Sequence, residues 1–268
     1  MAMIEEAERE GGGGWTRGFR DLDRVLRGES TRPSALRGGS IAVAPGRLTW
    51  AVTVLCMAYG ACMGVFAVLS PGGPRSMQVV ASMVKTPLLF YLTLAVTLPS
   101  LYVLNALVGS RLSFGSVFRL LSASLGVNAA VLASMGPIVA FFSVCTTSYP
   151  FMVVLNVAVF AASGFLALGF LLQTLQRLSV ARASSSAVEP GADDRPSGPV
   201  PPMTDEFARR RVRLIFRIWM VLFGLVGAQM GWVLRPFIGN PNLPFAWFRP
   251  RESNFFEAVL QALAALFS

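Results

Sequence analysis

The sequence predicts an all-α fold: an integral membrane helical bundle with about five transmembrane helices. The first observation is a mostly apolar stretch of 57 residues, 120–176, without a charged side chain. A helix rises about 1.5 Å per residue and the hydrocarbon core is roughly 30 Å thick, so this stretch is long enough to cross a membrane twice. The second is the composition, with 14% charged residues and a mean hydropathy of +0.58. Soluble domains carry about 25% charged residues.

Five predicted spans are separated by charges, prolines or a short polar turn. The proline-glycine break 71–74 ends the first span, and Lys85 precedes the second, where we expect it at the membrane interface. The polar turn 143–150 reverses the chain between the third and fourth spans. The spans cover residues 48–70, 86–108, 118–142, 151–173 and 214–234.

The distribution of basic residues predicts the orientation. If the N-terminus is cytoplasmic, 18 of the 23 Lys and Arg residues fall on the cytoplasmic side. Positive residues are retained on that side during insertion, so we expect an N-in, C-out protein of the cell inner (cytoplasmic) membrane. The basic residues left on the outer face are Arg75, Lys85, Arg235, Arg249 and Arg251.

The spans divide the chain into five parts. Within the N-terminal part, the segment 15–28 has apolar residues at helical spacing beside four Arg residues, which is typical of an interfacial helix on anionic lipid or of a solvated helix in a tail. The linker is rich in Ser, Pro, Gly and Ala, a composition that favours disorder. The parts are the cytoplasmic tail 1–47, the four-helix membrane region 48–176, the disordered cytoplasmic linker 177–213, the fifth transmembrane helix 214–234 and an outer part 235–268.

The outer part combines aromatic residues with prolines. Between residues 232 and 256 there are seven aromatic residues and four prolines, and aromatic side chains prefer the membrane boundary. Residues 254–268 form a largely apolar helix too short to span, which we expect on the outer interface or folded back against the bundle. We expect Arg235 to anchor this part by pairing with Glu252 or Glu257 or with loop carbonyls; the alternative is an anchor that faces lipid phosphate.

Small residues recur every four positions on three spans. They allow helix backbones to approach closely in a solvent that gives helices no hydrophobic drive to associate. We expect them to pack helices within one chain, with homodimer formation through the first or fifth span as the alternative. The residues are Gly60 and Gly64, then Ser122, Gly126, Ala130 and Ser134, then Gly227 and Gly231.

Several functional classes are disfavoured by the residues that are missing. The chain has no His and only three Cys, with no CxxC pair, so we expect neither a metal site, a cofactor nor a catalytic residue. No acidic residue occurs between Glu29 and Glu189, which disfavours proton coupling. Nucleic acid binding is disfavoured because the Arg residues flank apolar runs.

Four neutral amides fall inside the predicted spans. Hydrogen bonds between helices, worth about 0.6–2 kcal/mol each, explain them adequately. Alternatively, they line a path for a small solute. A path requires the amides to converge in a hydrated cavity, whereas a packing role requires them to be buried and satisfied. They are Asn105, Asn128, Asn156 and Gln229.

Four stretches of the chain carry a resemblance to known proteins. They are residues 85–87 (KTP), 98–114 (LPSLYVLNALVGSRLSF), 132–139 (LASMGPIV) and 226–256. Over residues 45–256 the chain resembles a group of uncharacterised bacterial polytopic membrane proteins. These are similar in layout to the Yip family, whose members have a cytoplasmic N-terminus, about five spans and roles in membrane organisation or trafficking. The resemblance implies no catalytic residues.

Together these observations predict a non-enzymatic membrane protein that organises or scaffolds partners. We expect its partners to be the lipid bilayer and either other membrane proteins or a second copy of the chain. The alternative is a channel or transporter component for a small solute.

Overall fold

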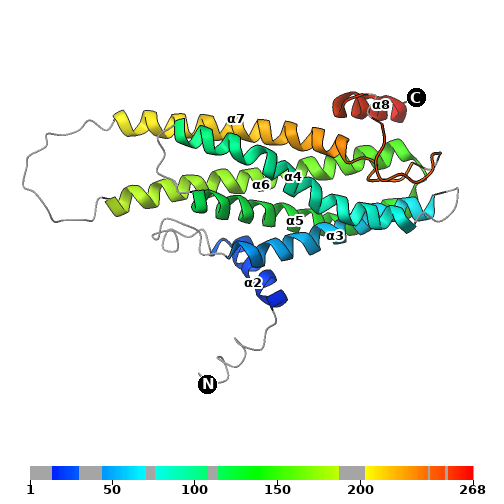
Figure 1. The fold of residues 1–268 in the computed structure, drawn as a ribbon, viewed down its shortest axis with the longest axis horizontal. Coiled ribbons are helices and arrows are strands. Elements are labelled where there is room, and N and C mark those ends of the chain that lie inside the picture. The colour runs from blue at the N-terminus through cyan, green and yellow to red at the C-terminus, as the bar shows by residue number, and fades with distance from the viewer. Residues whose placement is uncertain are drawn as a thin grey trace, which may run out of the picture.

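The protein is entirely helical over the part of the chain that its structure, a computed structural model, describes. That part comprises residues 14–29, 44–70, 76–107, 114–186, 203–240, 242–250 and 253–267, and it contains no strand. The all-α prediction is therefore confirmed (Figure 1). The helices are α2 (Gly14–Leu26), α3 (Pro45–Leu69), α4 (Ser76–Leu107), α5 (Phe114–Cys145), α6 (Tyr149–Ser186), α7 (Met203–Val233) and α8 (Phe255–Phe267).

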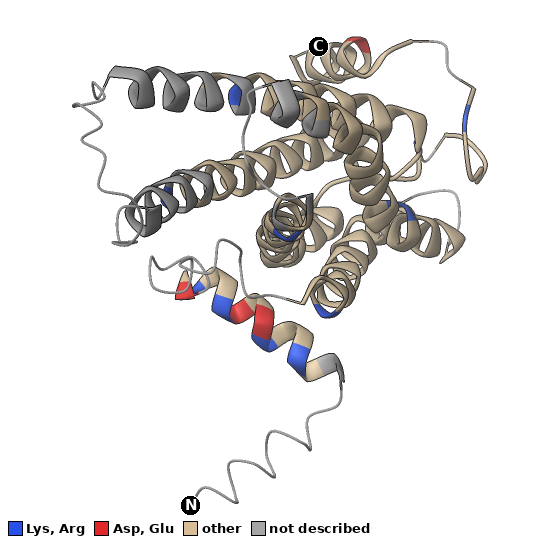
Figure 2. Ribbon diagram, turned by 60° about the vertical axis from the view of Figure 1, so that its left-hand side comes forward, with Lys and Arg blue, Asp and Glu red and all other residues tan. Residues whose placement is uncertain are grey.

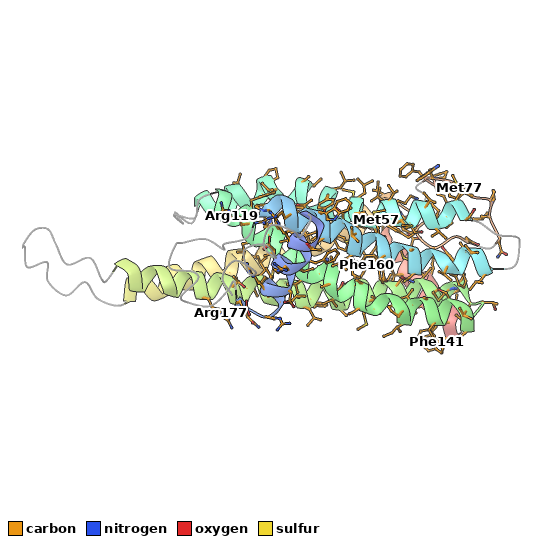
Figure 3. All side chains as sticks on the ribbon, turned by 90° about the horizontal axis from the view of Figure 1, so that it is seen from below. Met57, Met77, Arg119, Phe141, Phe160 and Arg177 are labelled. Carbon is orange, nitrogen blue, oxygen red and sulfur yellow. The ribbon has the colours of Figure 1, made fainter. Side chains whose placement is uncertain are left out.

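The five long helices α3 to α7 run up and down along a common axis (Figure 1). Helix α3 is central and packs against α4 on one side and α5 on the other, while α6 packs against α5 and α7 against α4. We call the end where α3 ends and α4 begins the outer end, and the opposite end the inner end. Arg119 and Arg177 both lie toward the inner end (Figure 3).

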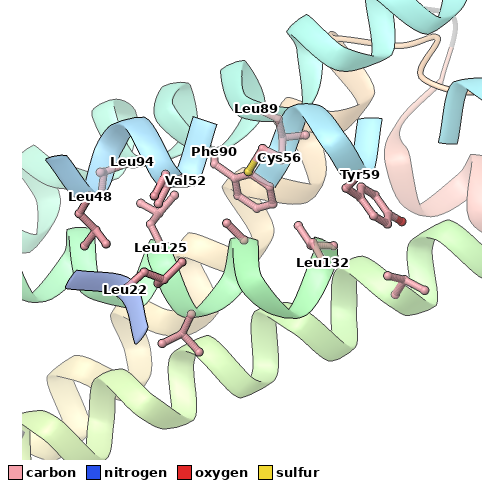
Figure 4. Packing of buried hydrophobic residues seen from close by; sticks show 14 of the residues in the cluster. Leu22, Leu48, Val52, Cys56, Tyr59, Leu89, Phe90, Leu94, Leu125 and Leu132 are labelled. Atoms are coloured by element: carbon pink, nitrogen blue, oxygen red, sulfur yellow. The ribbon is translucent and has the colours of Figure 1, made fainter. Parts of the chain in front are cut away.

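The core lies along α3. Its residues Val52, Cys56 and Tyr59 are fully or almost fully buried. They face Phe90 from α4 and Leu132 from α5 (Figure 4). Burial of such side chains stabilises the contact less in lipid than in water, because the surrounding lipid is itself apolar, so close packing has to hold these helices together.

The outward surface of the bundle is apolar, as a membrane requires. Large apolar side chains such as Phe165 and Val144 are mostly exposed. Four helical stretches are long and apolar enough to cross a bilayer, and the chain is therefore a helical membrane protein. The fifth predicted span is also helical, but its apolar part is shorter, Arg217–Val233. The four stretches are Pro45–Leu69, Ser76–Ser100, Val117–Cys145 and Tyr149–Thr174.

Helix α4 corrects the predicted position of Lys85. The second span was expected to begin at residue 86, with Lys85 at the interface, but α4 begins at Ser76 and its apolar stretch includes Lys85. The helix continues through Lys85, because the ammonium group of this residue is buried against the chain that follows α7. A charge marks a span boundary only when it faces solvent or lipid head groups.

The predicted disordered linker is shorter than residues 177–213. Helix α6 continues to Ser186 and α7 already begins at Met203, so both flanks of the linker are helical. Arg and Ala, which are common in these flanks, are good helix formers and extend a membrane helix beyond the apolar region. Residues 187–202 of the predicted linker lie outside the described residues.

Helix α2 packs on the bundle with one face. Leu22 and Val25 are buried in the core cluster, and Asp21 forms an ion pair with Arg47 at 3.4 Å. The exposed face carries both basic and acidic residues (Figure 2), with Arg27 paired to Asp23 at 2.8 Å, together with the apolar side chains of Phe19 and Leu26. Both sequence interpretations of this segment, as an interfacial or as a solvated helix, lacked this contact with α3 and α5.

Leu22→Ala is expected to weaken the packing of α2 by about 2 kcal/mol, the usual value for exposing one Leu side chain. The substitution also removes the methyl groups that approach Gly126. Limited proteolysis of the N-terminal region in detergent should become several times faster. Leu26→Ala is the matched control, because Leu26 is 50% exposed. Equal cleavage rates for both variants would contradict the docked arrangement.

Candidate functional site

Three polar side chains of α4 form the most unusual feature of the bundle. Gln78, Ser82 and Lys85 are spaced by four and three residues, so they lie on one face of the helix. All three are almost completely buried, with exposed fractions of 1% or less. Buried polar groups in a membrane protein require partners, because hydrocarbon offers none.

The partners are backbone carbonyl groups of residues 234–250, which we call the outer segment. The Gln78 Nε2 donates to the carbonyls of Pro236 (3.1 Å) and Phe237 (2.9 Å), and the Ser82 hydroxyl also donates to Phe237. The Lys85 ammonium group donates to the carbonyls of Pro236 (3.0 Å) and Trp247. The polar face of α4 therefore binds the outer segment at two places that are 11 residues apart in the sequence.

These contacts explain how irregular backbone is tolerated beside the apolar helices. Gly231, near the end of α7, packs against Leu89 of α4, whereas Gly239 packs against Ala67 near the outer end of α3. Between these two points the chain leaves the helix after Val233 and continues without secondary structure. Each unsatisfied carbonyl in hydrocarbon costs several kcal/mol, so the donors of α4 stabilise a path that lipid alone would not permit.

Two glycines bring α3 close to this face. An added Cβ at Gly60 would lie 2.5 Å from the Ser82 carbonyl oxygen, and one at Gly64 would lie 2.7 Å from the Cα of Val79. Only glycine permits such an approach of two backbones. These two predicted packing residues thus pack α3 against α4, directly behind the polar face.

The positive charge of Lys85 is compensated by dipoles. Among the described residues, no carboxylate forms an ion pair with it. Its nitrogen instead contacts the two carbonyl oxygens and lies 5.1 Å from the centroid of the Phe248 ring. Carbonyl dipoles and an aromatic face both attract a cation, and the burial makes their loss costly.

Arg235 makes a second set of contacts in the outer segment. Its guanidinium group donates to the Pro250 carbonyl and stacks 3.6 Å from the centroid of the Trp232 ring. A loop carbonyl was one of the partners that the sequence suggested. The backbone N–H of Glu257 donates to the side chain of Asn254 at the start of α8. Glu252 lies outside the described residues.

The remaining predicted packing residues are divided between contacts within the chain and the outer surface of the bundle. Gly227 and Gly231 face Thr93 and Leu89 of α4, and Gly126 faces Leu22 of α2. The α5 stripe turns away from the core along its length: Ser122 is buried, Ala130 is half-buried and Ser134 is exposed. The hydroxyl of Ser134 donates to the Val131 carbonyl of its own helix.

The predicted amides do not gather at one level. The Asn156 side chain accepts a hydrogen bond from the Tyr59 hydroxyl (2.8 Å) and is buried. It follows the first residue of α6 by seven positions, whereas Asn128 precedes the last residue of α5 by 17. With a rise of about 1.5 Å per residue, these two amides differ in depth by about 15 Å. Gln229 is half-buried near the outer end of α7, and the side chain of Asn105 lies outside the described part.

The Tyr59–Asn156 hydrogen bond is expected to couple α3 to α6 by about 1 kcal/mol, which is typical of such bonds between membrane helices. A double-mutant cycle with Tyr59→Phe and Asn156→Leu, measured by unfolding in detergent, gives this coupling energy. Thr53→Ala with Asn156→Leu is the control cycle, because Thr53 bonds to Tyr91 instead. Equal coupling energies in the two cycles would show that the bond contributes nothing specific.

Sequence reasoning singled out Lys85 but not Gln78 or Ser82. The signal in the sequence was that Gln78, Ser82 and Lys85 follow one another at intervals of four and three residues, which places them on one face of an apolar helix. Its meaning depends on the carbonyls of the outer segment, more than 150 residues away in the sequence. Such pairing is not visible in local patterns.

Chemically, the site offers hydrogen-bond donors. No group of three or more Cys, Asp or Glu is placed to hold a metal ion within the described ranges. Comparison with protein-family models, with curated proteins and with solved structures finds no match to this chain.

Proposed function

We propose that this protein is a non-enzymatic, multi-pass protein of the cell inner membrane that scaffolds other membrane proteins through its outer segment. The observation that carries the proposal is the attachment of the outer segment to buried donors of α4. This attachment leaves Trp247 and Phe248 exposed by 42% and 59%, and Leu243 by 44%. A fixed backbone that presents exposed aromatic side chains has the properties of a binding surface.

An ordered surface binds a partner more tightly than a flexible one. A flexible loop loses conformational entropy when it binds a partner, and this loss weakens the complex. The outer segment is already held by Gln78, Ser82 and Lys85, so a partner would meet an ordered surface. Trp, Tyr and Arg are the residues that contribute most often to binding energy at such surfaces.

A channel or transporter component is the alternative function. The different depths of Asn128 and Asn156 disfavour a common path, and the hydrogen bond from Tyr59 favours a packing role for Asn156. The Asn128 side-chain oxygen is buried and has no hydrogen-bond partner among the described residues, so packing is supported at Asn156 alone. The resemblance to Yip-like proteins agrees with a role in membrane organisation, and it remains part of the proposal.

Photo-cross-linking in native membranes tests the scaffold function. A photoreactive amino acid at Phe248 should yield a discrete adduct with another membrane protein, and Lys85→Met should remove this adduct. The same amino acid at Phe165, which is 77% exposed on α6, is the matched control for a lipid-facing site. Identical adducts at both positions would refute a specific surface. Solute movement by the purified protein in liposomes would favour the alternative.

The orientation is tested separately. A reporter that is active only in the cytoplasm is expected to be active when fused before Met1 and inactive when fused after Ser268. The reason is that the N-in, C-out orientation places 18 of the 23 Lys and Arg residues on the cytoplasmic side. Strong cytoplasmic activity of the C-terminal fusion would overturn the N-in, C-out arrangement.

A further inference from the structure

Three basic side chains gather at the outer end of the bundle. Lys85 donates to the carbonyl of Trp247, and Arg235 donates to the carbonyl of Pro250. Trp247 and Pro250 lie on either side of Arg249 in the sequence. The side chains of Lys85 and Arg235 therefore both contact residues 247–250. Arg249 is also within electrostatic range of Lys85.

The negative charge in this region is small. Lys85 together with residues 232–257 contains four basic side chains and two acidic side chains, Glu252 and Glu257. Lys85 is compensated by carbonyl groups and an aromatic ring. An excess of positive charge in a partly buried site attracts an anion, and the attraction is stronger there than in water.

Arg249 has donor capacity that the described residues do not use. Its Nη2 makes a long hydrogen bond of 3.3 Å to the Pro244 carbonyl. Its Nε atom is buried, and no acceptor among the described residues reaches it. A guanidinium group donates in a planar fork that matches two oxygen atoms of a phosphate.

Tyr149 adds a further donor from another helix. It is the first residue of α6 and lies within electrostatic range of both Arg235 and Arg249. A phenol hydroxyl donates readily to an anionic oxygen. The site therefore combines groups from α4, α6, the end of α7 and the outer segment.

We propose that Arg249, with Arg235 and Tyr149, binds a phosphate group, and that the expected source is the headgroup of an anionic phospholipid. The aromatic residues Trp232, Trp247 and Phe248 around the site favour this source, because aromatic side chains prefer the headgroup level of a membrane. The inference goes beyond the proposed scaffold function: both use Trp247 and Phe248, but lipid binding by the purified protein is measured without any partner protein.

Titration of the purified full-length protein in detergent tests the site, with binding followed by native mass spectrometry. The probes are dioctanoyl phosphatidylglycerol, dioctanoyl phosphatidylcholine and inorganic phosphate. Wild-type protein is expected to bind the anionic lipid at least 10-fold more tightly than the zwitterionic one. Arg249→Gln should lose most of this preference, and Arg217→Gln, which removes an exposed arginine at the inner end of the apolar part of α7, should keep it.

Two further arms keep the test decisive. Tyr149→Phe, which preserves the packing of the ring, should weaken anionic lipid binding about threefold even if Arg249→Gln does not fold. Competition by inorganic phosphate at equal concentration would support the phosphate site and assign it to a free phosphate. Equal binding of both lipids, or unchanged binding in both Arg249→Gln and Tyr149→Phe, would overturn the proposal.

Discussion

Lys85→Met is expected to release the outer segment and to destabilise the protein by about 3 kcal/mol. Methionine fills a similar volume but cannot donate, so the carbonyls of Pro236 and Trp247 lose a charged donor. Hydrogen bonds to charged groups contribute about 1.5–3 kcal/mol each, and relief from burying the ammonium group offsets part of the loss of two. The unfolding midpoint in detergent should fall, and proteolysis within residues 241–252 should become at least 10-fold faster.

Arg217→Met is the matched control for this substitution. It also replaces a cation by methionine, but Arg217 is exposed near the inner end of the apolar part of α7. Its stability and cleavage pattern should remain close to those of the wild type. If Lys85→Met behaves like the control, Lys85 does not hold the outer segment.

Gly60→Val is expected to separate α3 from α4 and to cost about 3 kcal/mol. The first carbon of the new side chain would lie 2.5 Å from the Ser82 carbonyl oxygen and 2.8 Å from the Cα of Met83. Both are backbone atoms that cannot rotate away, so the helices themselves have to move. The movement would also displace Ser82 and Lys85, so the outer segment should become more sensitive to protease.

Gly164→Val on α6 provides the comparison for Gly60→Val. No atom lies within 4 Å of an added Cβ at Gly164, so the unfolding free energy in detergent should change by less than about 1 kcal/mol. An equal loss of stability in both variants would mean that valine acts through helix propensity rather than through the contact between α3 and α4.

The sequence was sufficient for the class of fold because membrane helices are specified locally. The uncharged stretch 120–176 contains most of α5 and α6, and the predicted polar turn 143–150 includes residues 146–148, where the chain is not helical. The small residues Gly60 and Gly64 indicated a close helix contact, and the structure assigns it to α3 and α4.

Features that depend on distant pairing could not be predicted. Lys85 was expected at the interface because a charge in an apolar run usually ends a span, and its burial becomes understandable only with the Pro236 and Trp247 carbonyls in place. The docking of α2 likewise depends on Leu22 meeting α3 and α5. In each case the local pattern supplied one partner, and the fold supplied the other.

A distance measurement across the outer end tests the central claim that the polar face of α4 fixes the outer segment. Spin labels at Leu243 and Val144 occupy exposed positions on the outer segment and on α5, in a background in which Cys56, Cys62 and Cys145 are replaced by Ala. Electron–electron double resonance in lipid nanodiscs should give one narrow distance distribution for this protein and a broad one after Lys85→Met. A broad distribution before the substitution, or a narrow one that Lys85→Met leaves unchanged, would contradict the claim.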